Sequence, residues 1–403
     1  MRVLFVNVID QKNHIHTRYY PLVFGYLVSY AEKHGYVFEH QYAEKVDKAT
    51  LVSFKPDIVA MTSITENYPR AEQYARLTKS FNPEIKVLIG GVHISSVPES
   101  LSTFMDVGII GEGEQTFLEL LQNNFEPKNT IKGIVFWKGL HLSTTPERGL
   151  IEPLDDIPHP RRDMFGSELR QPYLFTSRGC SYRCAFCSSS RFWKKVRFHS
   201  AEYVAEEIRQ LVSGGCKLIN IYDDCFPLDM DRVRRVKDLI RGLDVKFVLS
   251  VRANLVTEEM VAVFKEMNVT AVGMGLESNS PRILKYLQKG NTPSDNQRAV
   301  DILTKYGFHI HCSFIRDVPI ETKEDLKLTY DFIIRNKLCY DMYRLMRFPN
   351  TPIYEGSKDW IKCKVHYYRD RSMRAKRKIR RVLNDALKFS IFADTSEKQT
   401  IKK

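Results

Sequence analysis

The residues of this 403-residue chain that most clearly point to chemistry are three cysteines, Cys180, Cys184 and Cys187. Thiolates at the spacing Cys-x3-Cys-x2-Cys can hold three corners of one iron–sulfur cluster from a single loop. Three ligands leave the fourth iron of a [4Fe–4S] cluster open to another molecule. Structural zinc would need a fourth Cys or His ligand, and the nearest candidate is His199. A zinc site and three unrelated cysteines are therefore the less favoured alternatives.

The other five cysteines are scattered along the chain, and we interpret each as a small buried apolar residue. They are Cys216, Cys225, Cys312, Cys339 and Cys363. Among them, Cys225 is the best placed to line a substrate cavity. The amino terminus reads as a buried strand and not as a signal peptide, so we expect a cytoplasmic protein with reduced thiols. No run of 18 apolar residues occurs, and we expect no membrane span.

The cysteine motif resembles the cluster loop of radical S-adenosylmethionine (SAM) enzymes, in which an aromatic residue, here Phe186, precedes the last cysteine. The resemblance implies that the open iron chelates SAM, and that an electron from the cluster splits SAM into methionine and a 5′-deoxyadenosyl radical. Three downstream segments, 223–224, 250–252 and 273–278, resemble the strand ends that contact SAM in this family. Taken singly, each is better interpreted as a strand-end turn with a capping carboxylate, but their order behind the cysteine motif favours the SAM role. The SAM-binding residues implied by the resemblance are Phe186, Asp223, Asp224, Ser250, Arg252, Gly275 and Glu277.

Residues 1–125 alternate apolar runs of strand type with segments of helical periodicity. The runs are Val3–Val8, Asp57–Thr62, Lys86–Ile89 and Asp106–Ile110. Such alternation predicts a parallel, doubly wound sheet. Ligands of such sheets bind outside the carboxyl ends of the strands, where Gly, Ser, Thr and His collect in this sequence.

This amino-terminal part resembles the cobalamin-binding domain that precedes some radical SAM barrels, through segments 21–27, 56–59, 90–93 and 106–114. A generic nucleotide-binding Rossmann domain is the alternative, but no Gly-x-Gly-x-x-Gly follows the first strand. The resemblance implies a cobalamin floor after the second of these strands and glycines beside the nucleotide tail. The implied cobalamin-binding residues are Thr62, Ser63, Thr65, Glu66, Asn67, Tyr68, Gly90, Gly91, His93, Gly111 and Glu112.

Many corrinoid proteins carry Asp-x-His-x-x-Gly after the first strand, and its His replaces the lower cobalt ligand. Here Lys12 stands at the position of that His, and we interpret His14 as a surface or interface histidine. The resemblance therefore implies base-off cobalamin with no protein His ligand.

The sequence as a whole predicts an α/β protein. We expect a Rossmann-like cobalamin-binding domain over 1–130, a Pro- and Asp-rich linker over 131–168 and a partial (β/α)6 radical SAM barrel over 169–350. A small basic helical segment over 351–403 would follow. Residues 362–388 hold eleven Lys or Arg against two Asp, so most of the net charge of +13 belongs to this segment. We therefore expect no nucleic-acid partner.

The combined resemblance implies a C-methyltransferase in which the deoxyadenosyl radical abstracts hydrogen from an unactivated sp3 carbon, and that carbon then takes a methyl group from methylcobalamin. Cyclisation, dehydration or ring rearrangement with the same cofactors is one alternative. A non-catalytic corrinoid and iron–sulfur binding protein is another. The substrate would be a peptide, a protein side chain or a small molecule. An electron donor such as ferredoxin or flavodoxin would reduce the cluster, and the oxygen sensitivity of such a cluster suggests an anaerobic host.

Overall fold

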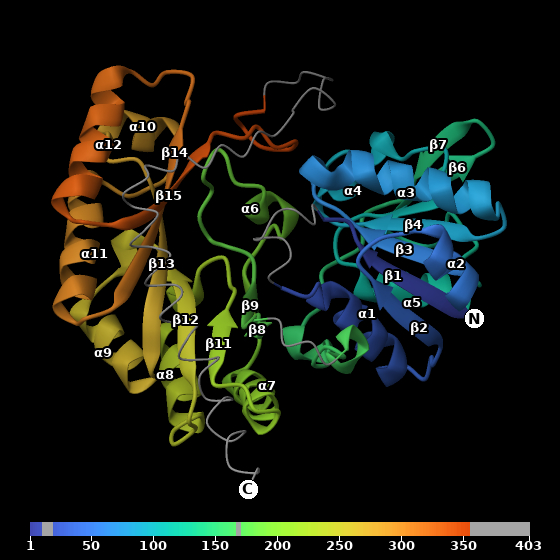
Figure 1. Ribbon diagram of the computed structural model, residues 1–403, viewed down its shortest axis with the longest axis horizontal. Coiled ribbons are helices and arrows are strands. Elements are labelled where there is room, and N and C mark those ends of the chain that lie inside the picture. The colour runs from blue at the N-terminus through green and yellow to red at the C-terminus, as the bar shows by residue number, and fades with distance from the viewer. Residues whose placement is uncertain (10–18, 167–170, 355–403) are drawn as a thin grey trace, which may run out of the picture. The chain divides into compact units, whose positions relative to one another are not determined.

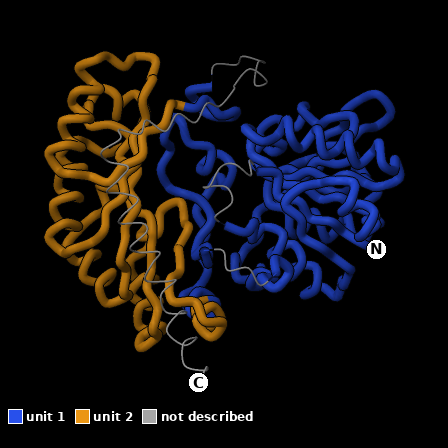
Figure 2. Tube along the Cα trace, viewed as in Figure 1, with its two compact units in different colours: residues 1–207, 346–365 blue, residues 208–345, 366–403 orange. Residues whose placement is uncertain are grey.

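The computed structural model describes residues 1–9, 19–166 and 171–354. These form two compact units, unit 1 with residues 1–207 and 346–354, and unit 2 with residues 208–345 (Figure 2). The predictions made for Lys12, His14, Cys363 and the basic helical segment from residue 355 onward lie outside the described residues.

Unit 1 is built on a seven-stranded sheet with the order β2-β1-β3-β4-β5-β6-β7 (Figure 1). Its strands are β1 (Arg2–Asn7), β2 (Glu39–Ala43), β3 (Ile58–Thr62), β4 (Lys86–Gly90), β5 (Val107–Ile109), β6 (Ile134–Lys138) and β7 (His141–Thr144). The first five are parallel, and the β6–β7 hairpin adds antiparallel strands at one edge. The chain reverses its direction of winding between β1 and β3, where sheets of this order bind ligands.

Helices cover both faces of this sheet because successive side chains of a strand point to opposite faces. On one face, Val3 and Phe5 pack with α1 and α5, and on the other, Leu4 and Val6 pack with α3. The helices are α1 (Leu22–Lys33), α2 (Lys48–Phe54), α3 (Tyr68–Phe81), α4 (Val92–Ser96) and α5 (Glu114–Gln122), with 3-10 turns at Thr65–Asn67 and Pro98–Ser100.

The cysteine motif lies in the segment that connects a short antiparallel pair of strands in unit 1. In this pair, β9 (Ser177–Arg178) is antiparallel to β10 (Arg197–Phe198), and Arg178 lies opposite Arg197. The neighbouring elements are 3-10 turns at Leu154–Asp156 and Asp163–Phe165, β8 (Tyr173–Leu174), α6 (Ser189–Phe192) and α7 (Ala201–Ser213). The motif therefore starts two residues after a strand that has a fixed partner.

Unit 2 repeats strand and helix, and neighbouring strands are parallel in chain order. The strands are β11 (Leu218–Ile221), β12 (Lys246–Val251), β13 (Val269–Glu277), β14 (His309–Arg316) and β15 (Cys339–Arg344). The helices are α8 (Met230–Leu239), α9 (Glu258–Glu266), α10 (Pro281–Tyr286), α11 (Pro293–Lys305) and α12 (Lys323–Arg335), with 3-10 turns at Phe226–Leu228 and Ala253–Leu255. Thr292 and Thr322 each form a capping box, which fixes where α11 and α12 begin.

The predicted α/β class and the strand–helix alternation of both halves are confirmed. The prediction that the scattered cysteines are buried holds for Cys225 and Cys312, but it is wrong for Cys216 and Cys339, which are partly exposed. Cys339 is partly exposed because it lies on the polar face of its strand, β15. In the described ranges, no helix combines the length and the apolar character needed to cross a membrane.

Candidate active site

The cluster loop presents three thiols of different exposure. Cys184 is buried, Cys180 and Cys187 are partly exposed, and none is in a disulfide. The backbone N–H of Cys187 donates to the carbonyl of Cys184 at 3.2 Å, which closes a tight turn. In the described part of the chain, no three His, Cys, Asp or Glu side chains converge on one point that could hold a single metal ion. A cluster requires less convergence, because each thiolate binds a different iron.

Gly179 sets the direction in which the chain enters this loop. Its φ is +99°, and a Cβ at this position would lie 2.5 Å from the carbonyl oxygen of Lys195. Only glycine combines this backbone conformation with such a close approach.

We expect Gly179→Ala to cost about 1–3 kcal/mol of unfolding free energy, because the new side chain is strained and also collides with backbone. The displaced carbonyl belongs to the segment beside the cluster loop, so iron content after reconstitution should fall as well. Urea denaturation and iron analysis would measure the two effects. Gly149→Ala is the control, since no atom lies within 4 Å of a Cβ at that position.

A buried ion-pair network, the Glu112 network, joins Glu112 and Glu114 to the two strands that flank the cluster loop. Arg178 donates to Glu112 at 2.7 Å and to Glu114 at 2.6 Å, and Arg197 donates to both oxygens of Glu112 at 2.7 and 2.9 Å. Both guanidinium groups also lie over the ring of Trp193, at 5.3 and 6.0 Å from its centroid. Charge-assisted pairs of this kind fix geometry strongly.

The structure places Glu112 inside this network. Its Oε2 also accepts a hydrogen bond from the backbone N–H of Ile151 at 3.0 Å. Burial raises the pKa of the Glu112 carboxyl, but the two arginines and this hydrogen bond outweigh burial and lower it. The carboxylate therefore stays ionised, and its partners join the Gly-Glu-Gly-Glu segment to the strands that flank the cysteine motif.

The predicted cobalamin floor lies at the carboxyl ends of β3 and β4. Ser63 is buried, and its hydroxyl has no hydrogen-bond partner among the described residues. Gly91 has a φ of +103°, and a Cβ there would lie 2.6 Å from the carbonyl oxygen of Ser63. The two turns therefore pack against each other, with an unsatisfied hydroxyl between the strand ends.

Three other predicted floor residues form an internal network. His93 is fully buried, and its ring nitrogens lie 3.2 Å from the Thr65 hydroxyl and 3.1 Å from the Ser100 hydroxyl. Its ring also contacts that of Tyr68 at 4.1 Å, and the Tyr68 hydroxyl donates to the carbonyl of Ser100 at 2.6 Å. These contacts occupy both ring nitrogens of His93 and support the turn after β3.

Burial lowers the pKa of His93 to about 4, so the folded protein holds the ring neutral at pH 7. The unfolded chain takes up this proton near pH 6.5, and stability is therefore lost as the pH falls from 6.5 through 4. We expect His93→Gln to remove about 2 kcal/mol of the stability difference between pH 7 and pH 4.5, because Gln does not titrate there. Urea denaturation of both proteins at the two pH values would measure this, and equal pH dependence would contradict it.

In unit 2, several predicted SAM-binding residues share one face of the sheet. Ser250 pairs with Gly273 in the strand register, and a Cβ on Gly273 would lie 3.2 Å from the Ser250 hydroxyl oxygen. Arg252 is buried at the end of β12 and donates to the carbonyl of Lys289. Asp223 is buried after β11, whereas Asp224 is exposed.

Glu277 lies over Gly275 and forms a buried ion pair with Lys289, at 2.9 Å. A Cβ on Gly275 would lie 2.4 Å from the Glu277 carboxylate, so the glycine makes room for this side chain. Lys289 was not among the predicted site residues, because its partner is twelve positions away and no local pattern marks it.

Comparison with known proteins matches two parts of the chain to two different family models. The family model of the radical SAM superfamily matches residues 174–333, and that of the B12 binding domain matches residues 15–121. An uncharacterized methyltransferase of Pyrococcus horikoshii is 34% identical over 357 residues, which cover 83% of this chain and 78% of that protein. The chain belongs to the cobalamin-binding radical SAM family.

Other members differ in the reaction after which they are named. An anaerobic magnesium-protoporphyrin IX monomethyl ester cyclase of Rubrivivax gelatinosus is 27% identical over 365 residues, covering 82% of this chain and 65% of the cyclase. The radical SAM methyltransferase TsrM of Kitasatospora setae, solved with cobalamin and a [4Fe–4S] cluster, has a TM-score of 0.71 at 19% identity. That match covers 88% of this chain and 74% of TsrM. The likeness to TsrM supports the fold.

The residues of this family member fit the cofactors of the family. Three thiols in one loop fit a cluster with one open iron. The unsatisfied Ser63 hydroxyl and the glycine turn beside it fit a polar group of a corrinoid. Buried charges at the ends of β11 to β13 fit the charged amino-acid end of SAM.

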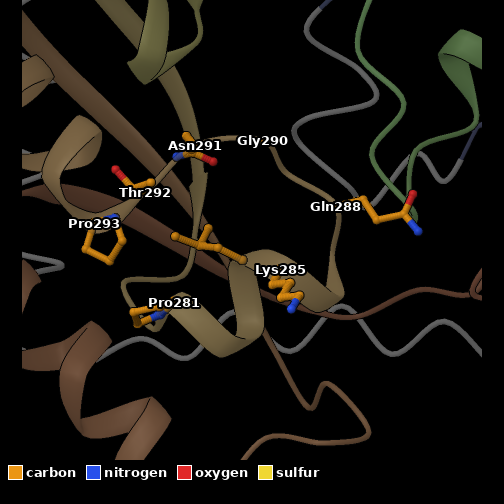
Figure 3. A pocket seen from close by; sticks show the side chains of 8 residues that line it. Pro281, Lys285, Gln288, Gly290, Asn291, Thr292 and Pro293 are labelled. Atoms are coloured by element: carbon orange, nitrogen blue, oxygen red, sulfur yellow. The ribbon is translucent and has the colours of Figure 1, made fainter.

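A surface cavity of unit 2 lies next to the contact between Arg252 and Lys289, because Gly290 lines it and a Cβ on Gly290 would lie 3.8 Å from the Arg252 guanidinium. It has a volume of about 430 Å³ and lies between α10 and the start of α11 (Figure 3). Its lining residues are Pro281, Leu284, Lys285, Gln288, Gly290, Asn291, Thr292 and Pro293. None of them belongs to the predicted SAM set, and with Lys285 as its one charged side chain the cavity offers no chemistry of its own.

Proposed function

We propose that this radical SAM enzyme transfers a methyl group to an unactivated sp3 carbon of a peptide, a protein side chain or a small molecule. The observation that carries the proposal is the presence of a three-thiol cluster loop and a B12 binding domain on one chain. The methyltransferase name of the 34% identical relative supports it. When bound, the cluster and SAM would supply a deoxyadenosyl radical, and cobalamin would carry the methyl group.

We assign the residues as follows. Cys180, Cys184 and Cys187 would hold the cluster. The SAM ammonium and carboxylate groups would be bound by acidic and basic residues such as Asp223 and Arg252. The protein's share of the reaction is to bind, to orient and to keep water out.

On the cobalamin side, Ser63 would donate its hydroxyl proton to a corrin or tail acceptor, and Gly90 and Gly91 would permit close approach. We further propose base-off binding without a protein His ligand, a cytoplasmic location and reduction by ferredoxin or flavodoxin. His93 would support the floor from below, because its ring nitrogens face Thr65 and Ser100.

Cyclisation is the second candidate function, favoured by one specific observation. The relative from Rubrivivax gelatinosus that covers 82% of this chain is named as a cyclase. A cyclase would form deoxyadenosine with the same cofactors but would leave no methyl group on the substrate.

Anaerobic purification with cluster reconstitution and added cobalamin, followed by SAM and a reductant, tests the proposal. Methylcobalamin together with 5′-deoxyadenosine is the expected result. Deoxyadenosine without methylcobalamin would favour cyclisation or dehydration. Neither product from a protein that has taken up both cofactors would favour a non-catalytic binding role, and failure to bind a corrinoid would overturn the assignment of unit 1.

A further inference from the structure

Three titratable side chains form a continuous hydrogen-bonded chain on the last two strands of unit 2. The Cys339 sulfur lies 3.3 Å from Nδ1 of His311, and Nε2 of His311 lies 3.1 Å from Oδ2 of Asp341. The Tyr343 hydroxyl donates to the same carboxylate oxygen at 3.1 Å. A thiol, an imidazole and a carboxylate thus stand in the order found in activated nucleophiles.

The strand register explains why these residues meet. His311 of β14 pairs directly with Cys339 of β15, and Ser313 pairs with Asp341. Side chains directly opposite on one face of a sheet lie within contact distance. The arrangement is therefore held by the backbone ladder and does not depend on a loop.

The same register places this group on the face that carries the predicted SAM residues. One row runs across four strands as Ser250, Gly273, His311 and Cys339. The alternate residues Met274, Cys312 and Phe314 are buried on the opposite face. Since neighbouring strands are spaced by about 4.8 Å, His311 lies about 10 Å from Ser250, with only a glycine between them.

The protonation of His311 suits a sulfur partner. Burial lowers its pKa, but the hydrogen bonds to Asp341 and Cys339 outweigh burial and raise it to about 9. At pH 7 both ring nitrogens therefore carry protons, and Nδ1 donates toward the Cys339 sulfur. The His311 side chain is 42% exposed, so a small molecule can reach the pair.

We propose that Cys339, His311 and Asp341 form a reactive-thiol centre that takes an electrophilic carbon, such as a polarised double bond, of a molecule bound over this face of the sheet. The Cys339 sulfur would act as a thiolate paired with the His311 imidazolium, its own proton having passed to solvent beforehand. It would form a bond to that carbon, the π electron pair would move to the neighbouring atom, and that atom would take the Nδ1 proton of His311, which is left neutral. Asp341 orients the imidazole. This inference rests on unit 2 alone and goes beyond the proposed methyl transfer.

The test is anaerobic labelling of the full-length, cluster-loaded protein with N-ethylmaleimide at pH 7, followed by peptide mass spectrometry. Cys216 is the internal reference, because it is also partly exposed and lies outside the group. We expect Cys339 to react at least about ten times faster than Cys216, since an ordinary thiol is only a few per cent ionised at this pH. Buried Cys312 should stay unlabelled.

His311→Gln should bring the Cys339 rate down to that of Cys216, and Tyr343→Phe should leave it within about two-fold, because Tyr343 does not touch the sulfur. Circular dichroism and iron content would show that each variant is folded. A wild-type Cys339 that reacts no faster than Cys216 overturns the proposal without any variant. So does an unchanged rate in folded His311→Gln. Because the assay measures neither deoxyadenosine nor methylcobalamin, its outcome is separate from that of the proposed function.

Discussion

Cys184→Ala is expected to remove the visible absorption of the iron–sulfur cluster and to reduce 5′-deoxyadenosine formation to background. Cys184 is the middle of the three motif cysteines and the one that is buried. Two remaining thiolates cannot hold three corners of a cluster, and the open iron that would bind SAM is lost with it. Changes in the outer shell of a metal site alone cost 10–100-fold, so the loss of a ligand should exceed about 100-fold.

Iron and sulfide analysis after anaerobic reconstitution, together with chromatographic detection of deoxyadenosine, would measure this loss. Cys216→Ala is the matched control, because it removes a partly exposed thiol that lies outside the motif. It should keep iron content and product formation near those of the wild type. A Cys184→Ala protein that retained a full cluster and product formation would show that the motif does not hold the cluster.

Most strands could be predicted because they are apolar runs bounded by turn residues. Strands β1, β3 and β4 were placed to within one residue at each end. Among the strands that were missed, β2 and β15 share one physical reason. β2 reads Glu-His-Gln-Tyr-Ala at a sheet edge, and β15 reads Cys-Tyr-Asp-Met-Tyr-Arg with its polar side chains on one face. Neither has the apolar excess that marks a buried strand.

Some residues of the candidate site could be predicted from neighbouring sequence positions, whereas others meet only through contacts between positions far apart in the chain. The cysteine motif is local, since its spacing is written within eight residues and needs no fold to be recognised. The Glu112 network joins positions 66 and 85 apart, and Cys339 meets His311 across 28 positions. Contacts of this kind depend on strand register and on how loops pack. No pattern in a single sequence reports them, although polar residues within otherwise apolar strands were a usable signal at β14.

Glu112→Gln is expected to lower the free energy of unfolding by about 3–5 kcal/mol, because it leaves Arg178 and Arg197 buried without their shared anion. Both arginine side chains are nearly inaccessible, at 10% and 5% exposure, so water cannot replace the lost carboxylate. The Gln amide keeps the shape of the Glu side chain and one acceptor oxygen. The change in unfolding free energy therefore measures mainly the loss of the negative charge. Within the described residues, Glu114 forms an ion pair with Arg178 and none with Arg197, so it cannot compensate Arg197.

The matched control is Glu147→Gln, which removes an exposed ion pair with Lys194 in the same unit. Exposed pairs contribute about 0–1 kcal/mol, so urea denaturation should separate the two variants clearly. Iron content distinguishes a network that only stabilises the fold from one that also positions the cluster loop. Because Arg178 is followed directly by Gly179 and Cys180, a network that positions the cluster loop should lose cluster in Glu112→Gln even where the protein is still folded. A Glu112→Gln protein as stable as Glu147→Gln would contradict the ion-pair account, and it would leave the carboxylate free for the cobalamin role that the sequence predicts.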